Sequence, residues 1–171
     1  MNTTSSVSRR NFLRGRLRPA PEPIRPPWST AKSIAAHCDS CGACIASCPE
    51  RIIAAGEGSY PLVSFAQGEC TFCGACAEAC PHPVFAPRNE PPWRLKPVIG
   101  KGCLAENGVW CRSCGDVCPE RAITFRMQIG GSAQILIDEH RCTGCGACVS
   151  VCPREVVSIV AAAVAEEAAH G

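Results

Sequence analysis

The chain has few of the residues from which a conventional hydrophobic core is built. Aromatic residues make up 5% of its 171 residues. Glycine, proline and cysteine are abundant instead, with 15, 15 and 16 residues. The chain has the length of about one ordinary domain, yet it can bury little hydrocarbon on folding. The folded state must therefore draw stability from something other than a packed apolar interior.

Long apolar runs and the motifs of common enzymes are also lacking. The longest mostly apolar stretch, residues 156–165, is about half of the roughly 20 residues that a membrane-spanning helix needs. No glycine pattern of a dinucleotide or phosphate loop is present, and no nucleophile–histidine–acid set stands out. Basic residues are not interleaved with aromatic ones as in nucleic-acid-binding folds. We therefore expect no membrane insertion, no nucleic-acid partner and no enzyme with a substrate of its own.

The cysteines fall into four groups, each of which ends in Cys-Pro, and none is left over. Three groups share the spacing C-x2-C-x2-C-x3-C-P, whereas seven residues separate the first two cysteines of the third group. The groups are Cys38, Cys41, Cys44 and Cys48; Cys70, Cys73, Cys76 and Cys80; Cys103, Cys111, Cys114 and Cys118; and Cys142, Cys145, Cys148 and Cys152. This is the spacing of [4Fe–4S] clusters in bacterial-type ferredoxins, so all 16 cysteines are predicted cluster ligands.

The regular spacing suits a cube because three thiolates lie on one tight loop around a corner of it. The small pairs Gly42-Ala43, Gly74-Ala75 and Gly146-Ala147 let the backbone approach the inorganic sulfides. Glycine also tolerates the unusual dihedral angles of such a loop. Loop amides can then donate hydrogen bonds to sulfur, which tunes the reduction potential.

The fourth cysteine of each motif predicts how the motifs combine. In two-cluster ferredoxins it ligates the other cluster of the pair. The predicted sites are Cys38, Cys41, Cys44 and Cys80; Cys48, Cys70, Cys73 and Cys76; Cys118, Cys142, Cys145 and Cys148; and Cys103, Cys111, Cys114 and Cys152. We expect clusters at the three regular motifs and a fourth at the stretched one, whose insertion Leu104–Trp110 leaves a count of three as the alternative. Without clusters the chain should be largely unfolded.

Other uses of the cysteines fit the pattern less well. Cysteine triplets spaced two residues apart are a poor disulfide framework, which would also require export. Zinc sites pair two C-x2-C units or include histidine, and the chain has only four histidines. His37 and His140 lie just before first cysteines, either facing solvent or donating to a cluster. Four cysteines per group favour closed clusters that transfer electrons over clusters with an open iron.

Charge is unevenly distributed along the chain. Residues 1–32 carry seven basic residues and one acid, whereas residues 33–171 carry ten basic residues and fourteen acids. Each oxidised cluster with four thiolates adds about −2, so a body with four clusters has a charge of about −12. The Arg9-Arg10 pair fits the twin-arginine export pattern, but Gly15–Trp28 has three arginines and five prolines where an apolar segment is required. The alternatives are a solvated basic arm and a segment that a partner or the export machinery recognises.

An internal repeat predicts an α+β fold of two tandem bacterial-type (2[4Fe–4S]) ferredoxin-like units with an extended N-terminal arm. Each unit is expected to have a short helix leaving Cys-Pro, followed by a two-stranded hairpin. Trp28 is expected to dock the end of the arm on the body. The predicted segments are a basic proline-rich arm (1–32), a first unit (33–87), a linker (88–99) and a second unit (100–171) with a short C-terminal helix over Ser158–Glu167.

The layout resembles the NapF family, ferredoxin-type accessory proteins of periplasmic nitrate reductase systems. The resemblance covers essentially the whole chain. It is carried by the arginine-rich N-terminus, by the segment Ile24–Ser29 and by a stretched third motif that opens Gly102-Cys103-Leu104-Ala105.

The resemblance implies a cytoplasmic protein that acts on the catalytic subunit of periplasmic nitrate reductase before that subunit is exported. The implied task is maturation, by assembly or reduction of that subunit's own [4Fe–4S] cluster. Labile clusters on free thiols also favour a reducing compartment, and hence the cytoplasm. The alternative is a general one-electron carrier between redox enzymes. A simple carrier needs no basic proline-rich arm, which favours the accessory role.

Overall fold

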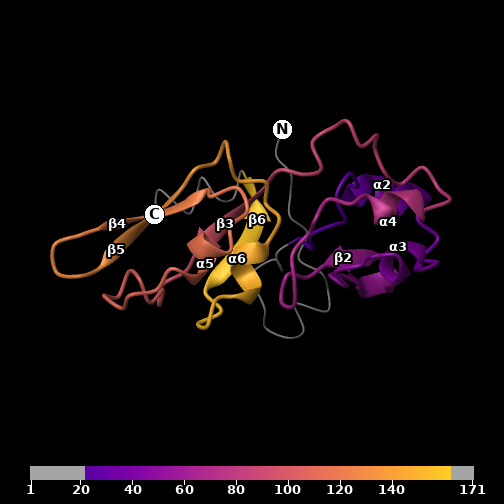
Figure 1. The fold of residues 1–171 in the computed structure, drawn as a ribbon. Helices are drawn as coiled ribbons and strands as arrows, with labels where there is room; N and C mark the ends of the chain where they lie inside the picture. The colour runs from indigo at the N-terminus through magenta and orange to yellow at the C-terminus, as the bar shows by residue number, and fades with distance from the viewer. Residues whose placement is uncertain (1–21, 163–171) are drawn as a thin grey trace, which may run out of the picture.

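The computed structural model describes residues 22–162, which form two halves lying side by side (Figure 1). We call residues 22–87 the first half and residues 95–162 the second half. The first half contains α2 (Ala31–His37), α3 (Ala43–Ala46), β1 (Ile53–Ala55), the 3₁₀ turn η1 (Glu57–Ser59), β2 (Pro61–Val63) and α4 (Ala75–Glu78). The second contains β3 (Leu95–Ile99), α5 (Ser113–Asp116), β4 (Ile123–Met127), β5 (Ala133–Ile137), α6 (Ala147–Ser150) and β6 (Val157–Ala161). Short helices and two-stranded sheets make a mixed α+β fold, as predicted.

Each regular cysteine motif turns into a short helix at its glycine. Gly42, Gly74 and Gly146 precede α3, α4 and α6 with φ of 79°, 80° and 85°. This left-handed conformation is one that glycine adopts without steric cost, which confirms the role expected of the Gly-Ala pairs. In the stretched third motif Arg112 precedes α5 instead, with φ of −133°. The third motif therefore enters its helix by a different backbone path.

The helix of each motif lies before Cys-Pro, not after it as the repeat predicted. Helix α3 ends at Ala46, and Pro49 follows Cys48 in a turn closed by a hydrogen bond from Arg51 N–H to the Cys48 carbonyl at 3.2 Å. Arg51 has a φ of 54°, which breaks any helix at that point. The third and fourth motifs turn in the same way, with positive φ at Arg121 and Glu155.

Antiparallel hairpins follow the first and third motifs, as the repeat predicted. In the first half, Ile53 pairs with Val63 and Ala55 with Pro61. In the second half, β4 and β5 pair over five residues, from Ile123 opposite Ile137 to Met127 opposite Ala133. This longer hairpin projects from the end of the molecule away from the first half (Figure 1).

The second half has an additional strand pair that corrects two predictions. Strand β3 pairs antiparallel with β6, with Leu95 opposite Ala161 and Ile99 opposite Val157. Residues 95–99 are therefore a strand within the expected linker 88–99. Residues 158–161 are a strand where a helix over Ser158–Glu167 was expected, because the β-branched Ile159 and Val160 favour a strand and the backbone pairs with β3. Residues 163–167 of that expected helix lie outside the described range.

The first half is completed by the segment that precedes its first cysteine. The amide of Val63, in β2, donates to the Ile24 carbonyl at 2.8 Å. Trp28 is 8% exposed, and its indole Nε1–H donates to the Glu90 carbonyl at 3.0 Å. The Trp28 carbonyl accepts from Ala86 N–H at 2.7 Å. The expected docking of Trp28 is thus confirmed, while residues 1–21, including Arg9 and Arg10, lie outside the described range.

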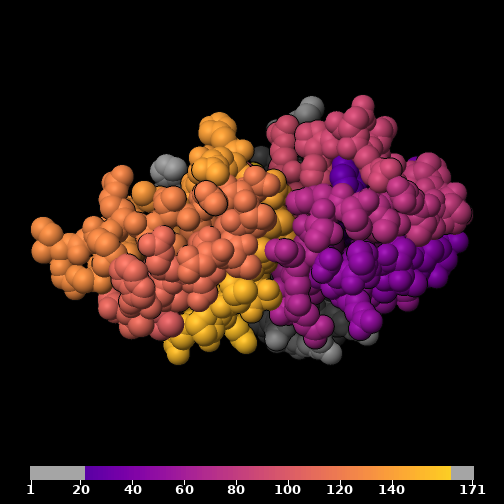
Figure 2. Space-filling model, viewed as in Figure 1, coloured from indigo at the N-terminus to yellow at the C-terminus, as the bar shows by residue number. Residues whose placement is uncertain are grey.

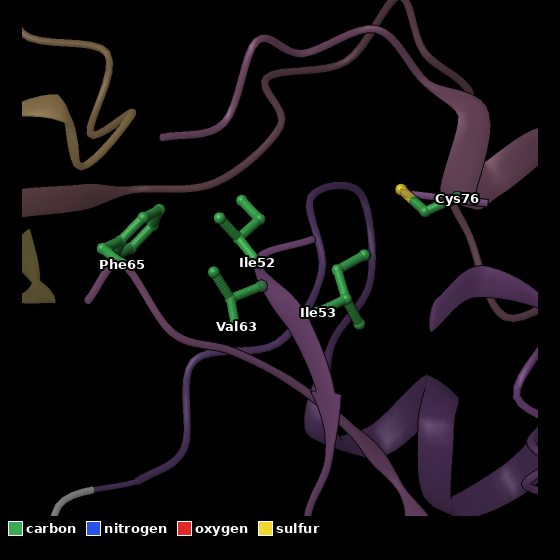
Figure 3. Close-up of a cluster of buried hydrophobic side chains, with 5 residues drawn as sticks. All are labelled: Ile52, Ile53, Val63, Phe65 and Cys76. Carbon is green, nitrogen blue, oxygen red and sulfur yellow. The ribbon is translucent and has the colours of Figure 1, made fainter. Parts of the chain in front are cut away.

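The two halves lie directly against each other in the space-filling view (Figure 2). Ile52, Ile53 and Val63 lie between Phe65 and Cys76 (Figure 3), and Val149 and Ile159 of the second half pack against this cluster. A backbone hydrogen bond of 2.8 Å from Cys70 N–H to the Cys145 carbonyl also links the halves. Within residues 22–162 no helix is long and apolar enough to cross a membrane.

Candidate iron–sulfur sites

The first predicted site lies between the two motifs of the first half. We call it site I. Its cavity is lined by Cys38, Cys41, Cys44 and Cys80, so that three thiols come from the first motif, Cys44 in α3 and the other two in the loop before it, and one from the end of the second motif. Helices α3 and α4 pack together, which brings the fourth cysteine of one motif to the loop of the other. The structure therefore groups these four thiols as the crossed arrangement predicted.

Two further cavities show the same crossed grouping in the centre of the molecule. Site II is lined by Cys48, Cys70, Cys73 and Cys76, and site III by Cys118, Cys142, Cys145 and Cys148. These sites face each other across the junction, because the Cys70 amide of site II is bonded to the Cys145 carbonyl of site III. Sites I, II and III therefore follow one another along the molecule.

The thiols of the stretched motif also gather with one cysteine of the last motif. We call this group site IV. Burial raises the pKa of the Cys114 thiol to about 11, and the charges of the neighbouring Cys103, Cys111 and Cys152 add to this. Cys103 and Cys114 are both buried. The insertion Leu104–Trp110 thus leaves the four thiols of the predicted set close to one another.

Burial makes it unfavourable for the thiols to ionise unless a cation is present. It raises the pKa of Cys70 in site II to about 12. It raises the pKa of Cys148 in site III to about 12 as well, and the neighbouring thiols add to this. In site I, burial raises the pKa of Cys44, with further contributions from Cys38 and Cys80. Binding of iron at such a site would therefore release thiol protons, and the iron would offset the repulsion among four thiolates.

Backbone amides donate to cysteine sulfur in three of the motifs. Ser40 N–H lies 3.4 Å from Cys38 Sγ, and Phe72 N–H lies 3.4 Å from Cys70 Sγ. Ala122 N–H lies 3.3 Å from Cys118 Sγ. These bonds stabilise negative charge on sulfur, and such bonds raise the reduction potential of iron–sulfur centres.

An ion pair beside site I was missed by sequence reasoning. His82 Nε2 lies 3.0 Å from Asp39 Oδ2, and this contact holds the pKa of the Asp39 carboxyl below its usual range. The crossed arrangement could have predicted this pair. It places Cys38 and Cys80 in one site, and Asp39 and His82 follow these cysteines closely in the sequence. His37 and His140 are both exposed, as the solvent-facing alternative expected.

The donor set of these sites fits [4Fe–4S] clusters. Cavities I, II and III are each lined by four thiols, the number that a closed cluster requires. Within residues 22–162 no three cysteine, histidine or acidic side chains are arranged to share a single metal ion.

Two regions of the chain match the family described as the 4Fe-4S dicluster domain. The matched regions are residues 37–85 and residues 109–156. They correspond to the paired motifs of the first half and to most of the paired motifs of the second. The protein therefore contains two dicluster ferredoxin domains.

Similarity to whole proteins extends over nearly the entire chain. A "Ferredoxin-type protein NapF" of Haemophilus influenzae is 44% identical over 92% of this chain and 96% of the relative. One of Escherichia coli is 45% identical over 89% of this chain and 93% of the relative. A subunit of an ion-translocating oxidoreductase complex of Methanosarcina acetivorans is 34% identical, over 71% of this chain and 46% of the relative.

Proposed function

The chain belongs to the NapF family of ferredoxin-type iron–sulfur proteins, and on this basis we propose that sites I–IV hold four [4Fe–4S] clusters. The observation that carries the proposal is the crossed grouping of thiols. Each of sites I–III combines three cysteines of one motif with the last cysteine of its partner motif. A bound cluster would supply reversible one-electron chemistry. In this proposal the protein transfers electrons and is not an enzyme with its own substrate.

The residues around each site position and insulate a cluster. Twelve thiolates from the loops and four from the Cys-Pro turns would fix four cubes in the order I, II, III, IV. Amide donors at Ser40, Phe72 and Ala122 would stabilise the reduced state. Apolar residues such as Val84 and Ile123 exclude water, which limits proton exchange and cluster loss.

We further propose that the protein acts in the cytoplasm on the catalytic subunit of periplasmic nitrate reductase before export. It would supply electrons for assembly or reduction of that subunit's own cluster. Family membership supports this role. So does the segment of residues 1–32 with its seven basic residues, which a small electron carrier does not need. The alternative is a general one-electron carrier, which the row of four sites would serve equally well.

Exchanging single cysteines tests the crossed arrangement directly. Cys80→Ala should remove the cluster of site I and Cys48→Ala that of site II, each lowering iron from about 16 to about 12 atoms per chain. Electron paramagnetic resonance of the reduced variants should lose different signals. If Cys80→Ala instead removed the same signal as Cys76→Ala, each motif would hold its own cluster and the crossed arrangement would be wrong.

An anaerobic pull-down from nitrate-respiring cells separates the accessory role from that of a general carrier. Tagged wild type should retain the unexported nitrate reductase subunit, and an Arg9→Ala/Arg10→Ala variant with unchanged iron should retain less if the arm mediates recognition. Retention of nothing specific by a fully iron-loaded protein would favour the general carrier. A variant lacking residues 1–21 provides the control, because the part of the chain that contains Ile24 and Trp28 stays intact.

A further inference from the structure

A groove of about 470 Å³ lies at the junction between the halves, beside sites II and III. Its walls carry three aromatic side chains, Trp28, Phe72 and Trp93, and three basic ones, Arg88, Arg94 and Lys96. We propose that this groove docks an acidic segment of the protein that exchanges electrons with this chain. The proposal rests on the clusters of the proposed function but not on the identity of the partner.

The groove is preorganised by contacts from both halves. The Trp93 indole Nε1–H donates to the Thr143 carbonyl at 3.0 Å, and its ring meets that of Phe72 edge to face with centroids 5.5 Å apart. The Trp28 amide donates to the Pro92 carbonyl at 2.7 Å. Aromatic walls that are already fixed lose little entropy on binding, and aromatic residues are enriched at the energetic centres of interfaces.

The charge of the groove is opposite to that of the body around it. Three bases and one acid, Glu90, line the groove, whereas residues 33–171 as a whole carry fourteen acids and ten bases. Lys96 Nζ is held by the carbonyls of Glu139 and Cys142, and Arg88 pairs with Glu78 at 2.8 Å. Arg94 is exposed and forms no ion pair with any of residues 22–162. Its guanidinium is therefore the cation that an incoming carboxylate would meet.

The position of the groove suits electron exchange at the centre of the row of sites. Cys142 of site III lines it directly, and Phe72, between Cys70 and Cys73, brings site II to the opposite wall. A partner seated here would reach sites II and III over the short paths that electron transfer requires. One electron would leave a reduced cluster and reduce the partner's centre by one, or the reverse, with no bond formed or broken.

An acidic protein segment fits this groove better than a nucleic acid strand. Arg88 and Lys96 already have partners within the protein, which leaves Arg94 for a localised carboxylate. A phosphate chain would need many cations along its length and would extend over the acidic surface beyond the groove.

The first test measures binding without depending on electron transfer. Fluorescein-labelled hexaglutamate should bind the iron-loaded protein at low salt, and Arg94→Glu should weaken binding about tenfold, since a like charge replaces the cation. Arg126→Glu is the matched control, because Arg126 is exposed on β4 and its replacement changes the net charge by the same amount. If the two variants weakened hexaglutamate binding equally, the effect would come from net charge alone and the proposal would be overturned. Tighter binding of a labelled oligothymidylate than of hexaglutamate would overturn it as well.

The second test uses reduced protein and two one-electron oxidants of opposite charge. Ferricyanide should oxidise the clusters more slowly in Arg94→Glu than in wild type and Arg126→Glu, and hexaglutamate should slow it in wild type. Hexaamminecobalt(III), a cation, should not be slowed by Arg94→Glu. Unchanged ferricyanide rates in Arg94→Glu would overturn the groove as the site of exchange. Absence of iron from the wild type would instead contradict the proposed function, and an iron count of the same samples distinguishes that failure from a failure of the groove.

Discussion

The two halves carry the same paired cysteine motifs but are closed in different ways. The second half is closed by its own ends, because β3 precedes its first cysteine and pairs with β6, which follows its last. The first half has no such pair within the described residues. Its β2 hydrogen bonds to Ile24, and Trp28 is held by Ala86, Glu90 and Pro92. A ferredoxin unit can therefore be completed either by a terminal strand pair or by a buried tryptophan on an extended segment.

The halves also differ in the surfaces they expose. All five of the exposed large hydrophobic side chains found among the described residues belong to the second half. They are Val109, Trp110, Val117, Met127 and Ile129. They lie in the insertion of the third motif, after α5, and on the long β4–β5 hairpin. The additions that distinguish the second half are thus mostly solvent-facing, whereas the addition that distinguishes the first half, Trp28, is buried.

Removal of iron should abolish the folded structure of both halves, and with it the differences between them. The buried residues include four of the cysteines themselves, and every strand in the described range has at most five residues. We expect anaerobic chelation to unfold both halves together, since burial raises the pKa of the thiols and no charge would remain to hold them as thiolates. Circular dichroism and limited proteolysis would measure this. A protease-resistant second half after complete iron loss would show that the β3–β6 pair holds that half independently.

Trp28→Ala should destabilise the first half selectively. Truncating this buried side chain should lower the free energy of unfolding by about 3–5 kcal/mol. Because Trp28 closes only the first half, sites I and II should lose their clusters in urea before sites III and IV. The order of cluster loss would be measured by visible absorbance as urea is increased, combined with electron paramagnetic resonance of the remaining clusters. Simultaneous loss of all four clusters would mean that the halves unfold as one unit.

Gly146→Ala should weaken the contact between the two halves. A Cβ at Gly146 would lie 2.1 Å from the Phe65 ring of the first half, whereas one at Gly42 meets nothing within 4 Å. Both glycines have positive φ and line a cysteine site, so Gly42→Ala accounts for the backbone strain, roughly 1–2 kcal/mol, together with any crowding of the cluster. The clash should add roughly 1–3 kcal/mol at Gly146. Urea denaturation would compare the two variants, and equal destabilisation would show that Phe65 moves aside freely.

Trp110→Ser should have the smallest effect. Trp110 is 73% exposed, and its ring receives the Arg112 guanidinium at 6.0 Å. Loss of that exposed contact should cost below about 1 kcal/mol, in contrast to the loss at Trp28. Iron content should stay at the wild-type value. A fall in iron by about four atoms would show that the insertion supports the cluster of site IV.

Short-range features of the fold could be predicted from the sequence because they depend on local spacing. The left-handed conformation at Gly42, Gly74 and Gly146 follows from the Gly-Ala pair of each motif. The hairpins after the first and third motifs followed from the internal repeat. The crossed grouping of cysteines followed from the ferredoxin rule. Local backbone geometry was also misjudged after Cys-Pro, where positive φ at Arg51 rules out the predicted helix.

Long-range pairings could not be predicted because no local pattern specifies them. The alanine-rich tail that begins at Ser158 predicts a helix, yet residues 158–161 form part of β6 because β3, far away in the chain, offers a row of backbone partners. The groove depends on residues from the N-terminal segment, the second motif, the connecting segment and the last motif. The sequence by itself determined the four thiol sets and the two-unit organisation, since cysteine spacing fixes which sulfurs can converge. Only the tertiary structure decided how each half is closed and what faces the junction, because those depend on packing between segments far apart in the chain.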